Sequence, residues 1–91
     1  MTKIWHDTAW ADYVYWQTED RKTLRRINKL LISIDRDGYK CLGKPEPLKH
    51  DLSGFWSVEI DDKNRIVFRI REIDKVQHLE ISQCGSHYRD K

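Results

Sequence analysis

The sequence has little of three things: cysteine, long apolar runs and net charge. Its two cysteines, Cys41 and Cys84, are too few for a disulfide framework and lack the spacing of a metal site, which favours a reducing compartment. No apolar run approaches the length of a membrane span, and the N-terminus lacks the apolar core of a signal peptide. A formal net charge of +2 excludes a histone-like polycation. We therefore expect a cytoplasmic protein without a membrane segment.

Aromatic and charged residues are what the chain does have. Four Trp, four Tyr and two Phe among 91 residues can supply much of the burial that a thin core needs. This length predicts a single domain spanning residues 1–91. Charged residues make up 35% of the chain, which predicts a heavily charged surface. No pair of histidines has ligand spacing with a Cys or His partner, so we expect no metal site. The histidines are His6, His50, His78 and His87.

Hydrophobic periodicity divides the chain into a strand, two helices and three further strands. The expected elements are a strand at 3–5, a helix from Asp7 or Thr8 to about Gln17, a second helix from Thr18 or Asp20 to Gly38, and strands at 55–60, 65–71 and 76–83. Residues 39–54 have no periodicity and are expected to form a loop. This order predicts an α+β domain in which a helical hairpin packs on one face of an antiparallel meander sheet.

Each predicted helix has an apolar side that we expect to face the sheet. In the first helix, Trp10, Tyr13 and Val14 lie at helical spacing. The apolar stripe of the second helix is formed by Leu24, Ile27, Leu31 and Ile34. The opposite side of the second helix is basic, and a solvated surface is the usual reason for such a face. Its basic residues are Lys22, Arg25, Arg26, Lys29 and Arg36.

Alternation within the predicted strands places arginines on the face of the sheet that the helices do not cover. If Ile66, Phe68 and Ile70 face the helices, the intervening arginines face away from them. These are Arg65, Arg69 and Arg71. A connection of odd length over residues 61–63 would place Glu59 across from Arg65 on the same open face. An arginine on the wet face of a strand is ordinary, so this row does not by itself indicate a site.

The most informative segment is residues 43–50, Gly-Lys-Pro-Glu-Pro-Leu-Lys-His, closed by Ser-Gly-Phe-Trp at 53–56. Prolines on both sides of Glu46 fix an extended, stiff backbone. Stiffness suits a general base, whose position must be set before the substrate arrives. Arg65 and the terminal pair His87 and Tyr88 complete the residue types of a metal-free ribonuclease. Taken alone, the same residues also fit a proline-rich turn and an unrelated solvated tail.

Together these residues resemble the YoeB family of toxins, within the RelE group of bacterial toxin–antitoxin systems. The resemblance rests on Ile4-Trp5, Trp10, Asp12-Tyr13, Tyr15-Trp16-Gln17, Ile27-Asn28, residues 43–50 and 52–57, Asn64-Arg65 and His87-Tyr88. It implies a fold like that of small microbial ribonucleases and a ribosome-dependent endoribonuclease that cuts mRNA in the decoding site and inhibits translation. It also implies a cognate antitoxin, the 70S ribosome and mRNA as partners, and no cofactor. The resemblance leaves open whether the protein forms a homodimer.

The resemblance also implies roles for individual residues. Glu46 would be the general base, Arg65 would stabilise the transition state, and His87 would protonate the leaving group. Tyr88 either stacks on a nucleotide or packs the C-terminus down. Further RNA contacts are expected from Lys49, His50 and Arg69, and from the basic helix side at Lys22, Arg25 and Lys29, which would dock on ribosomal RNA. A ParE-like gyrase poison or a non-catalytic RNA-binding module are the alternatives.

The chain departs from its apparent relatives at three places. Val58-Glu59 stands where many relatives carry two arginines, so a carboxylate replaces a site cation. Gly85-Ser86 precedes the terminal pair, where relatives tend to carry a bulky or basic residue. Residues 89–91 extend past the tyrosine at which relatives usually stop. We expect Glu59 to compete with phosphate for Arg65.

Overall fold

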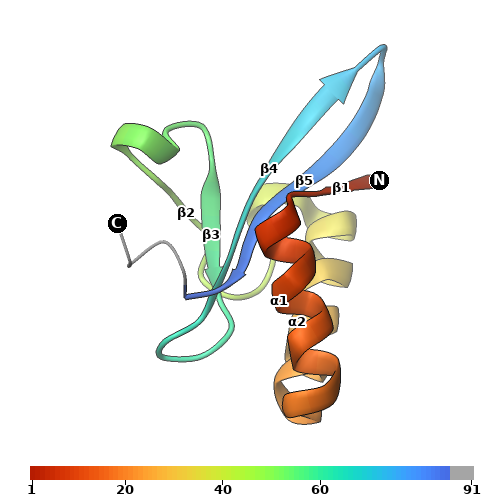
Figure 1. Cartoon of the computed structure of the whole chain (residues 1–91). Coiled ribbons are helices and arrows are strands. Elements are labelled where there is room, and N and C mark those ends of the chain that lie inside the picture. Colours follow the sequence, from red (N-terminus) through yellow and green to blue (C-terminus); the bar gives the residue numbers. More distant parts are fainter. Residues whose placement is uncertain (87–91) are drawn as a thin grey trace.

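Five strands form one sheet in the order β1-β5-β4-β3-β2, with two helices on one of its faces (Figure 1). This computed structural model describes residues 1–86. Its elements are β1 (Thr2–Trp5), α1 (Asp7–Glu19), α2 (Arg21–Asp37), the 3₁₀ turn η1 (Gly38–Lys40), β2 (Glu46–Pro47), the 3₁₀ turn η2 (His50–Leu52), β3 (Trp56–Glu59), β4 (Arg65–Ile73) and β5 (Val76–Gly85). The predicted α+β class and helical hairpin are confirmed.

The sheet is mixed, because one edge strand runs parallel to its neighbour. β2, β3, β4 and β5 form the expected antiparallel meander, and β1 pairs in parallel with β5. The long connection allows this parallel pairing, since the chain passes through both helices, β2, β3 and β4 before it reaches β5. Neither helix in the described part of the chain is long and apolar enough to cross a membrane.

The helical hairpin is fixed at both ends of α2 by local chemistry. Asp20 caps the helix, because its Oδ1 accepts hydrogen bonds from the backbone N–H groups of Lys22 and Thr23, each at 3.1 Å. Gly38 ends the helix with a positive φ of 62°. The predicted apolar stripe is largely buried, with Ile27 and Ile34 fully inaccessible. Sequence patterns therefore located this helix and its buried side.

The first helix buries only part of the side that its sequence indicated, because Tyr13 packs against the core but two of its neighbours do not. Trp10 is 51% exposed and Val14 is 45% exposed, whereas Ala9 and Asp12 are buried. The prediction was wrong for Trp10 and Val14, because α1 carries large apolar residues on several sides and periodicity does not select one of them. Burial is decided by the end of β5, where Asp12 Oδ2 accepts a hydrogen bond from the backbone N–H of Cys84 at 3.1 Å.

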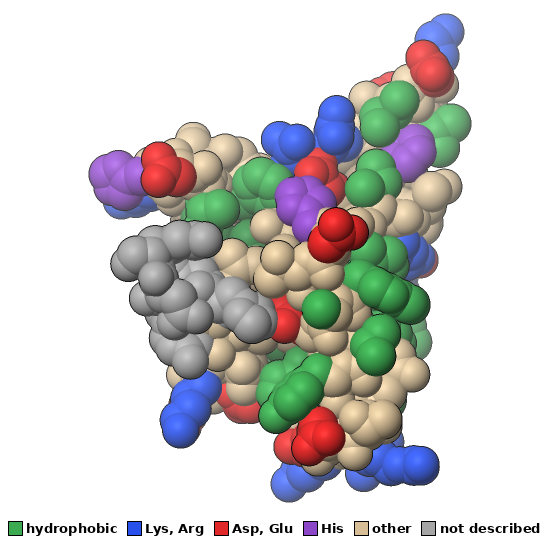
Figure 2. All heavy atoms as spheres, in the orientation of Figure 1, with side chains coloured by type: hydrophobic (Ala, Val, Ile, Leu, Met, Phe, Trp, Pro, Cys, Tyr) green, Lys and Arg blue, Asp and Glu red, His purple; other side chains and the backbone are tan. Residues whose placement is uncertain are grey.

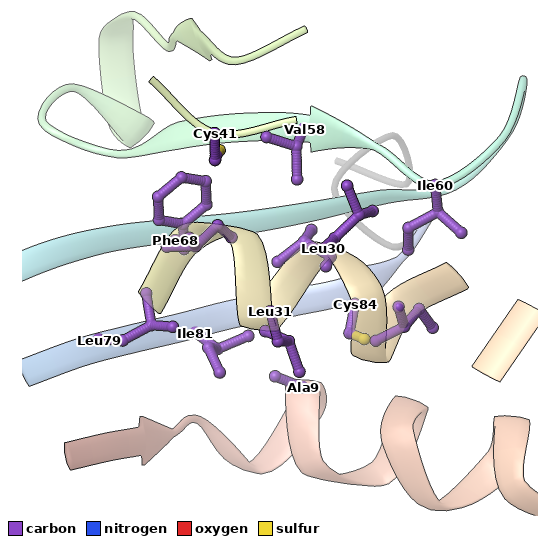
Figure 3. Packing of buried hydrophobic residues seen from close by; sticks show 13 residues of the cluster. Ala9, Leu30, Leu31, Cys41, Val58, Ile60, Phe68, Leu79, Ile81 and Cys84 are labelled. Carbon is purple, nitrogen blue, oxygen red and sulfur yellow. The ribbon is translucent and has the colours of Figure 1, made fainter. Parts of the chain in front are cut away.

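The core lies between the helices and one face of the sheet (Figure 3). Phe68, Leu79 and Ile81 project from the sheet towards α2, as alternation predicts. On the opposite face, Glu59 is paired with Arg65, which confirms the expected register. We call this side of the sheet, which the helices do not cover, the open face.

The β4–β5 hairpin is longer than expected and projects from the body of the domain (Figure 1). Ile73 pairs with Val76, so the turn consists of Asp74 and Lys75 alone. Both turn residues have positive φ, 50° and 67°, which is the geometry of a two-residue hairpin loop. Residues 72 and 73, which lie beyond the strand predicted at 65–71, therefore continue β4 to the turn.

Candidate active site

Gly43 anchors the segment that carries Glu46 to the rest of the domain. Its carbonyl oxygen accepts a hydrogen bond from the backbone N–H of Glu59 at 2.8 Å. Its φ is +92°, and an added Cβ would lie 2.8 Å from Leu30 Cδ2 and 2.9 Å from Val58 Cβ. Only glycine meets both the conformational and the steric demand at this position.

Glu46 lies on a short strand, not in the loop that the sequence predicted. Glu46 pairs with Ser57 and Pro47 pairs with Trp56 along the outer edge of β3. The backbone N–H of Leu48 continues the pairing by donating to Phe55 O at 2.9 Å. Proline is tolerated here because β2 is an edge strand. The strand contains two residues, which is too short for a periodic pattern, so it could not be predicted from the sequence.

Arg65 lies between two carboxylates on the open face. Its Nη1 is 3.9 Å from Glu46 Oε1, and its Nη2 is 3.6 Å from Glu59 Oε2. Lys44 Nζ is 4.0 Å from the other oxygen of Glu59. These distances exceed those of hydrogen bonds, so the side chains are held by charge and not by direct donation. The Glu46 side chain is 62% exposed and that of Arg65 is 25% exposed, so solvent reaches the carboxylate, whereas Arg65 Nη1 itself is buried.

A second charged group lies further along β4. Arg69 Nε and Arg71 Nη1 donate to Glu80 Oε1 at 2.7 and 3.2 Å, and His6 Nε2 contacts Glu80 Oε2. Burial raises the pKa of Glu80, but hydrogen bonds from His6, Arg69 and Arg71 outweigh it and lower the pKa to about 2. The Arg69 guanidinium also lies over the Phe55 ring, 4.7 Å from its centroid.

Sequence reasoning missed His6 and Glu80 in this group. A signal existed for Glu80, since it alternates with the core residues Leu79 and Ile81 and must share a face with the arginines. The predicted arginines do lie on the open face, and each of them meets a carboxylate of the same chain. Figure 2 shows basic and acidic side chains intermixed over the visible side of the molecule.

The other described residues that were predicted to bind RNA do not gather around Glu46 and Arg65. Lys49 and His50 are exposed beside β2, and among the described residues Arg65 is the cation that contacts Glu46. The basic side of α2 lines a separate groove of about 770 Å³ in the helix layer, away from the open face; Lys22, Arg25 and Lys29 belong to it. His87 and Tyr88 lie outside the described residues.

The described chain ends near the charged pair, since Gly85 pairs with Arg65 in the sheet. Within residues 1–86, no group of three or more His, Cys, Asp or Glu side chains is placed to hold a metal ion. The site that the structure assembles thus consists of Glu46, Arg65 and Glu59, with Lys44 at its margin.

Comparison with known proteins decides the family. Residues 5–88 match the family of YoeB-like toxins of bacterial type II toxin–antitoxin systems. The chain belongs to the YoeB family. Toxin YoeB of Escherichia coli (strain K12) is 41% identical over 88 residues, covering 97% of this chain and 100% of that protein. Toxin YoeB of Streptomyces coelicolor is 49% identical over 80 residues, covering 88% of this chain and 90% of that protein.

Solved YoeB structures share the fold over nearly the whole chain. The YoeB/ParE toxin from Agrobacterium tumefaciens superposes with a TM-score of 0.90 at 40% identity, covering 97% of this chain and 100% of the other. The toxin in a YoeB–YefM complex from Staphylococcus aureus gives 0.83 at 37% identity, covering 97% and 98%. A YoeB dimer from the same organism gives 0.82 at 38% identity, with the same coverage.

Proposed function

We propose that this YoeB-family toxin is a ribosome-dependent endoribonuclease that cuts mRNA in the decoding site and so inhibits translation. The observation that carries the proposal is the pairing of Glu46 and Arg65. A carboxylate on a proline-stiffened strand lies within ion-pair distance of an arginine on the exposed face of the same sheet. A base and a cation in this arrangement can act on the two sides of one phosphodiester.

RNA provides its own nucleophile, the 2′-hydroxyl next to the scissile phosphate. In the proposed reaction, Glu46 takes the proton of this hydroxyl while its oxygen attacks phosphorus. Arg65 donates to the phosphorane as negative charge accumulates there. The bond to the 5′-oxygen breaks, and His87 supplies the proton that this leaving group needs. The products are a 2′,3′-cyclic phosphate and a 5′-hydroxyl end, with no metal ion or cofactor required.

The ribosome would position the mRNA in this proposal. The groove along α2 combines five basic side chains with Ile32, which is 64% exposed. Such a surface suits ribosomal RNA, because cations there neutralise phosphates. It lies in the helix layer, so docking through it would leave Glu46 and Arg65 on the open face accessible to mRNA. Lys49, His50 and Arg69 are the proposed mRNA contacts, with Tyr88 stacking on a nucleotide.

We also propose a cognate antitoxin as a partner, and a homodimer as a further assembly. YoeB of Staphylococcus aureus is found in a complex with YefM and as a dimer. An acidic antitoxin segment on the open face must exchange with the carboxylates that already accompany Arg65 and Arg69. The affinity of the antitoxin should therefore depend on contacts other than those with Arg65 and Arg69. Protection of Arg65 from solvent in the complex would support this location.

Primer extension on translating ribosomes tests the proposed activity. We expect the wild type to cut mRNA, also in the presence of a chelator selective for transition metals. Glu46→Gln and His87→Ala should lower the cleavage rate by roughly 10²- to 10⁴-fold, the usual effect of removing a general base or acid. Glu72→Gln, an exposed carboxylate on the β4–β5 hairpin, is the control. Growth inhibition without any cleavage by the wild type would instead indicate a non-catalytic toxin.

A further inference from the structure

Two buried polar atoms next to Glu46 have no hydrogen-bond partner. Among residues 1–86, the buried side-chain atoms in this condition are Ser57 Oγ and Arg65 Nη1. Ser57 is 1% exposed and lies on β3 beside the core residue Val58. Buried polar groups in native proteins nearly always form hydrogen bonds, so two such atoms at one site require an explanation.

The sheet brings these two atoms to the same place. β3 lies between β4, which carries Arg65, and β2, which carries Glu46. Because Arg65 Nη1 is 3.9 Å from Glu46 Oε1, the two side chains meet over β3. Glu46 pairs in register with Ser57, and Ser57 points to the open face because its neighbour Val58 points to the core. The Ser57 hydroxyl therefore lies beneath the span between Arg65 and Glu46.

We propose that Ser57 is a phosphate-binding residue, whose hydroxyl donates together with Arg65 Nη1 to one non-bridging oxygen of an RNA phosphodiester. This inference rests on the proposed nuclease function and names a further group that would contact the phosphate. A guanidinium can only donate, and the serine hydroxyl has a proton to donate, so the missing partner is an acceptor. An anionic oxygen has enough lone pairs to accept from both groups.

The contacts of Arg65 allow such an oxygen to enter. Its distances of 3.9 Å to Glu46 and 3.6 Å to Glu59 are ion-pair contacts and not hydrogen bonds. The Glu46 side chain is 62% exposed, so it can turn outwards towards a 2′-hydroxyl without leaving a buried position. This movement would leave room for the phosphate between the base and the arginine.

Ser57→Ala separates this role from a structural one. The substitution removes a buried hydroxyl that has no partner, so the melting temperature should stay the same or rise. The cleavage rate under single-turnover conditions should fall by about 10- to 100-fold, below the loss typical of an oxyanion-hole donor that acts alone. Ser57→Thr, which keeps the hydroxyl, should restore most of the rate. Ser53→Ala, an exposed serine between β2 and β3, should change neither quantity.

Sulfur substitution at the phosphate examines the contact directly. Replacing one non-bridging oxygen by sulfur weakens the acceptor, so it should slow the wild type for one of the two diastereomers. The same replacement should have a smaller effect on Ser57→Ala, because the donor has already been removed. An equal effect of sulfur in both proteins, or an unchanged cleavage rate in Ser57→Ala, would overturn the assignment.

Binding of inorganic phosphate gives a readout that does not depend on cleavage. Titration followed by NMR signals of the Arg65 guanidinium should show affinity about 5- to 10-fold weaker for Ser57→Ala, as expected for one lost hydrogen bond. If the wild type fails to cut mRNA but this difference is observed, the nuclease proposal fails and the phosphate site stands. Equal affinity in both proteins, or no binding of phosphate to the wild type, would reject the site even if mRNA is cut.

Discussion

Replacing Glu80 with glutamine should destabilise the protein near neutral pH and have almost no effect in strong acid. Glu80 is the buried carboxylate of the open face, with a side chain that is 7% exposed. It accepts hydrogen bonds from Arg69 and Arg71 and contacts His6. Glutamine has the same shape but no charge, so both guanidinium groups would lose the counterion that holds them in place.

The shift in pKa gives the size and the direction of the effect. The pKa of Glu80 lies at about 2 in the folded protein, against an ordinary value of 4.5. At about 1.4 kcal/mol per pKa unit, this difference corresponds to about 3 kcal/mol. The side chains of Arg69 and Arg71 are 35% and 43% exposed, so solvent screens part of it and we expect about 2 kcal/mol. Because the folded-state pKa is depressed, this stability is complete above about pH 4.5 and is lost as the pH falls towards 2.

Urea unfolding of the wild type and Glu80→Gln at several pH values measures the effect. Near neutral pH, the midpoint of the variant should be lower by about 1 M urea. The two curves should converge as the pH falls below about 4.5, because the wild type then loses the same interaction. Glu72→Gln, an exposed residue of the same hairpin, should unfold like the wild type at every pH. A constant difference between wild type and Glu80→Gln from neutral pH down to about pH 2 would show that the ion pairs are not its source.

Two further substitutions address the site itself. Glu59→Arg removes the carboxylate that would compete with phosphate for Arg65, so RNA cleavage should be faster or RNA binding tighter. The salt dependence of binding should be steeper, and the free energy of unfolding should change by less than about 1 kcal/mol. Unchanged cleavage and unchanged salt dependence in kinetic assays would contradict this prediction. Gly43→Ala should lower stability by about 1–3 kcal/mol in urea and reduce cleavage, because its Cβ meets Leu30 at 2.8 Å. Gly54 also has a positive φ, but an added Cβ there would meet no atom within 4 Å. If Gly54→Ala lowers stability as much as Gly43→Ala, backbone strain and not the steric clash is responsible.

Local signals in the sequence accounted for much of the fold. The cap at Asp20 and the stop at Gly38 act within a few residues of the helix ends, so they can be identified without knowledge of the rest of the chain. Strand alternation likewise predicted the open face, and the connection after β3 predicted the pairing of Glu59 with Arg65. These features depend on neighbours in the sequence or on a single hairpin.

The features that were missed depend on contacts between distant segments. β2 exists because Glu46 and Pro47 pair with β3, and two residues have no period that could reveal a strand. Asp12 is buried because the end of β5 donates a hydrogen bond to it, against the preference of a charged residue for solvent. Glu80 could have been placed on the open face by alternation, but its contact with His6 requires the parallel pairing of β1 with β5. Tertiary packing decided each of these.

The charge balance of the open face has a consequence for how this toxin would bind RNA. Arg65, Arg69 and Arg71 meet carboxylates of Glu46, Glu59 and Glu80, so the face carries as many negative as positive side chains among these six. A phosphate that binds there must displace or screen a carboxylate, which weakens the electrostatic attraction for free RNA.

The groove on α2 differs from the open face in composition, because its basic side chains lie beside the exposed apolar residues Ile32 and Leu42. If RNA affinity comes mainly from that groove, the open face needs only to orient one phosphodiester once the mRNA is delivered. This division of labour would explain why the proposed nuclease needs the ribosome to act on mRNA. Under this reasoning, charge reversal at Lys22 and Lys29 should impair cleavage on ribosomes far more than Glu59→Arg improves it.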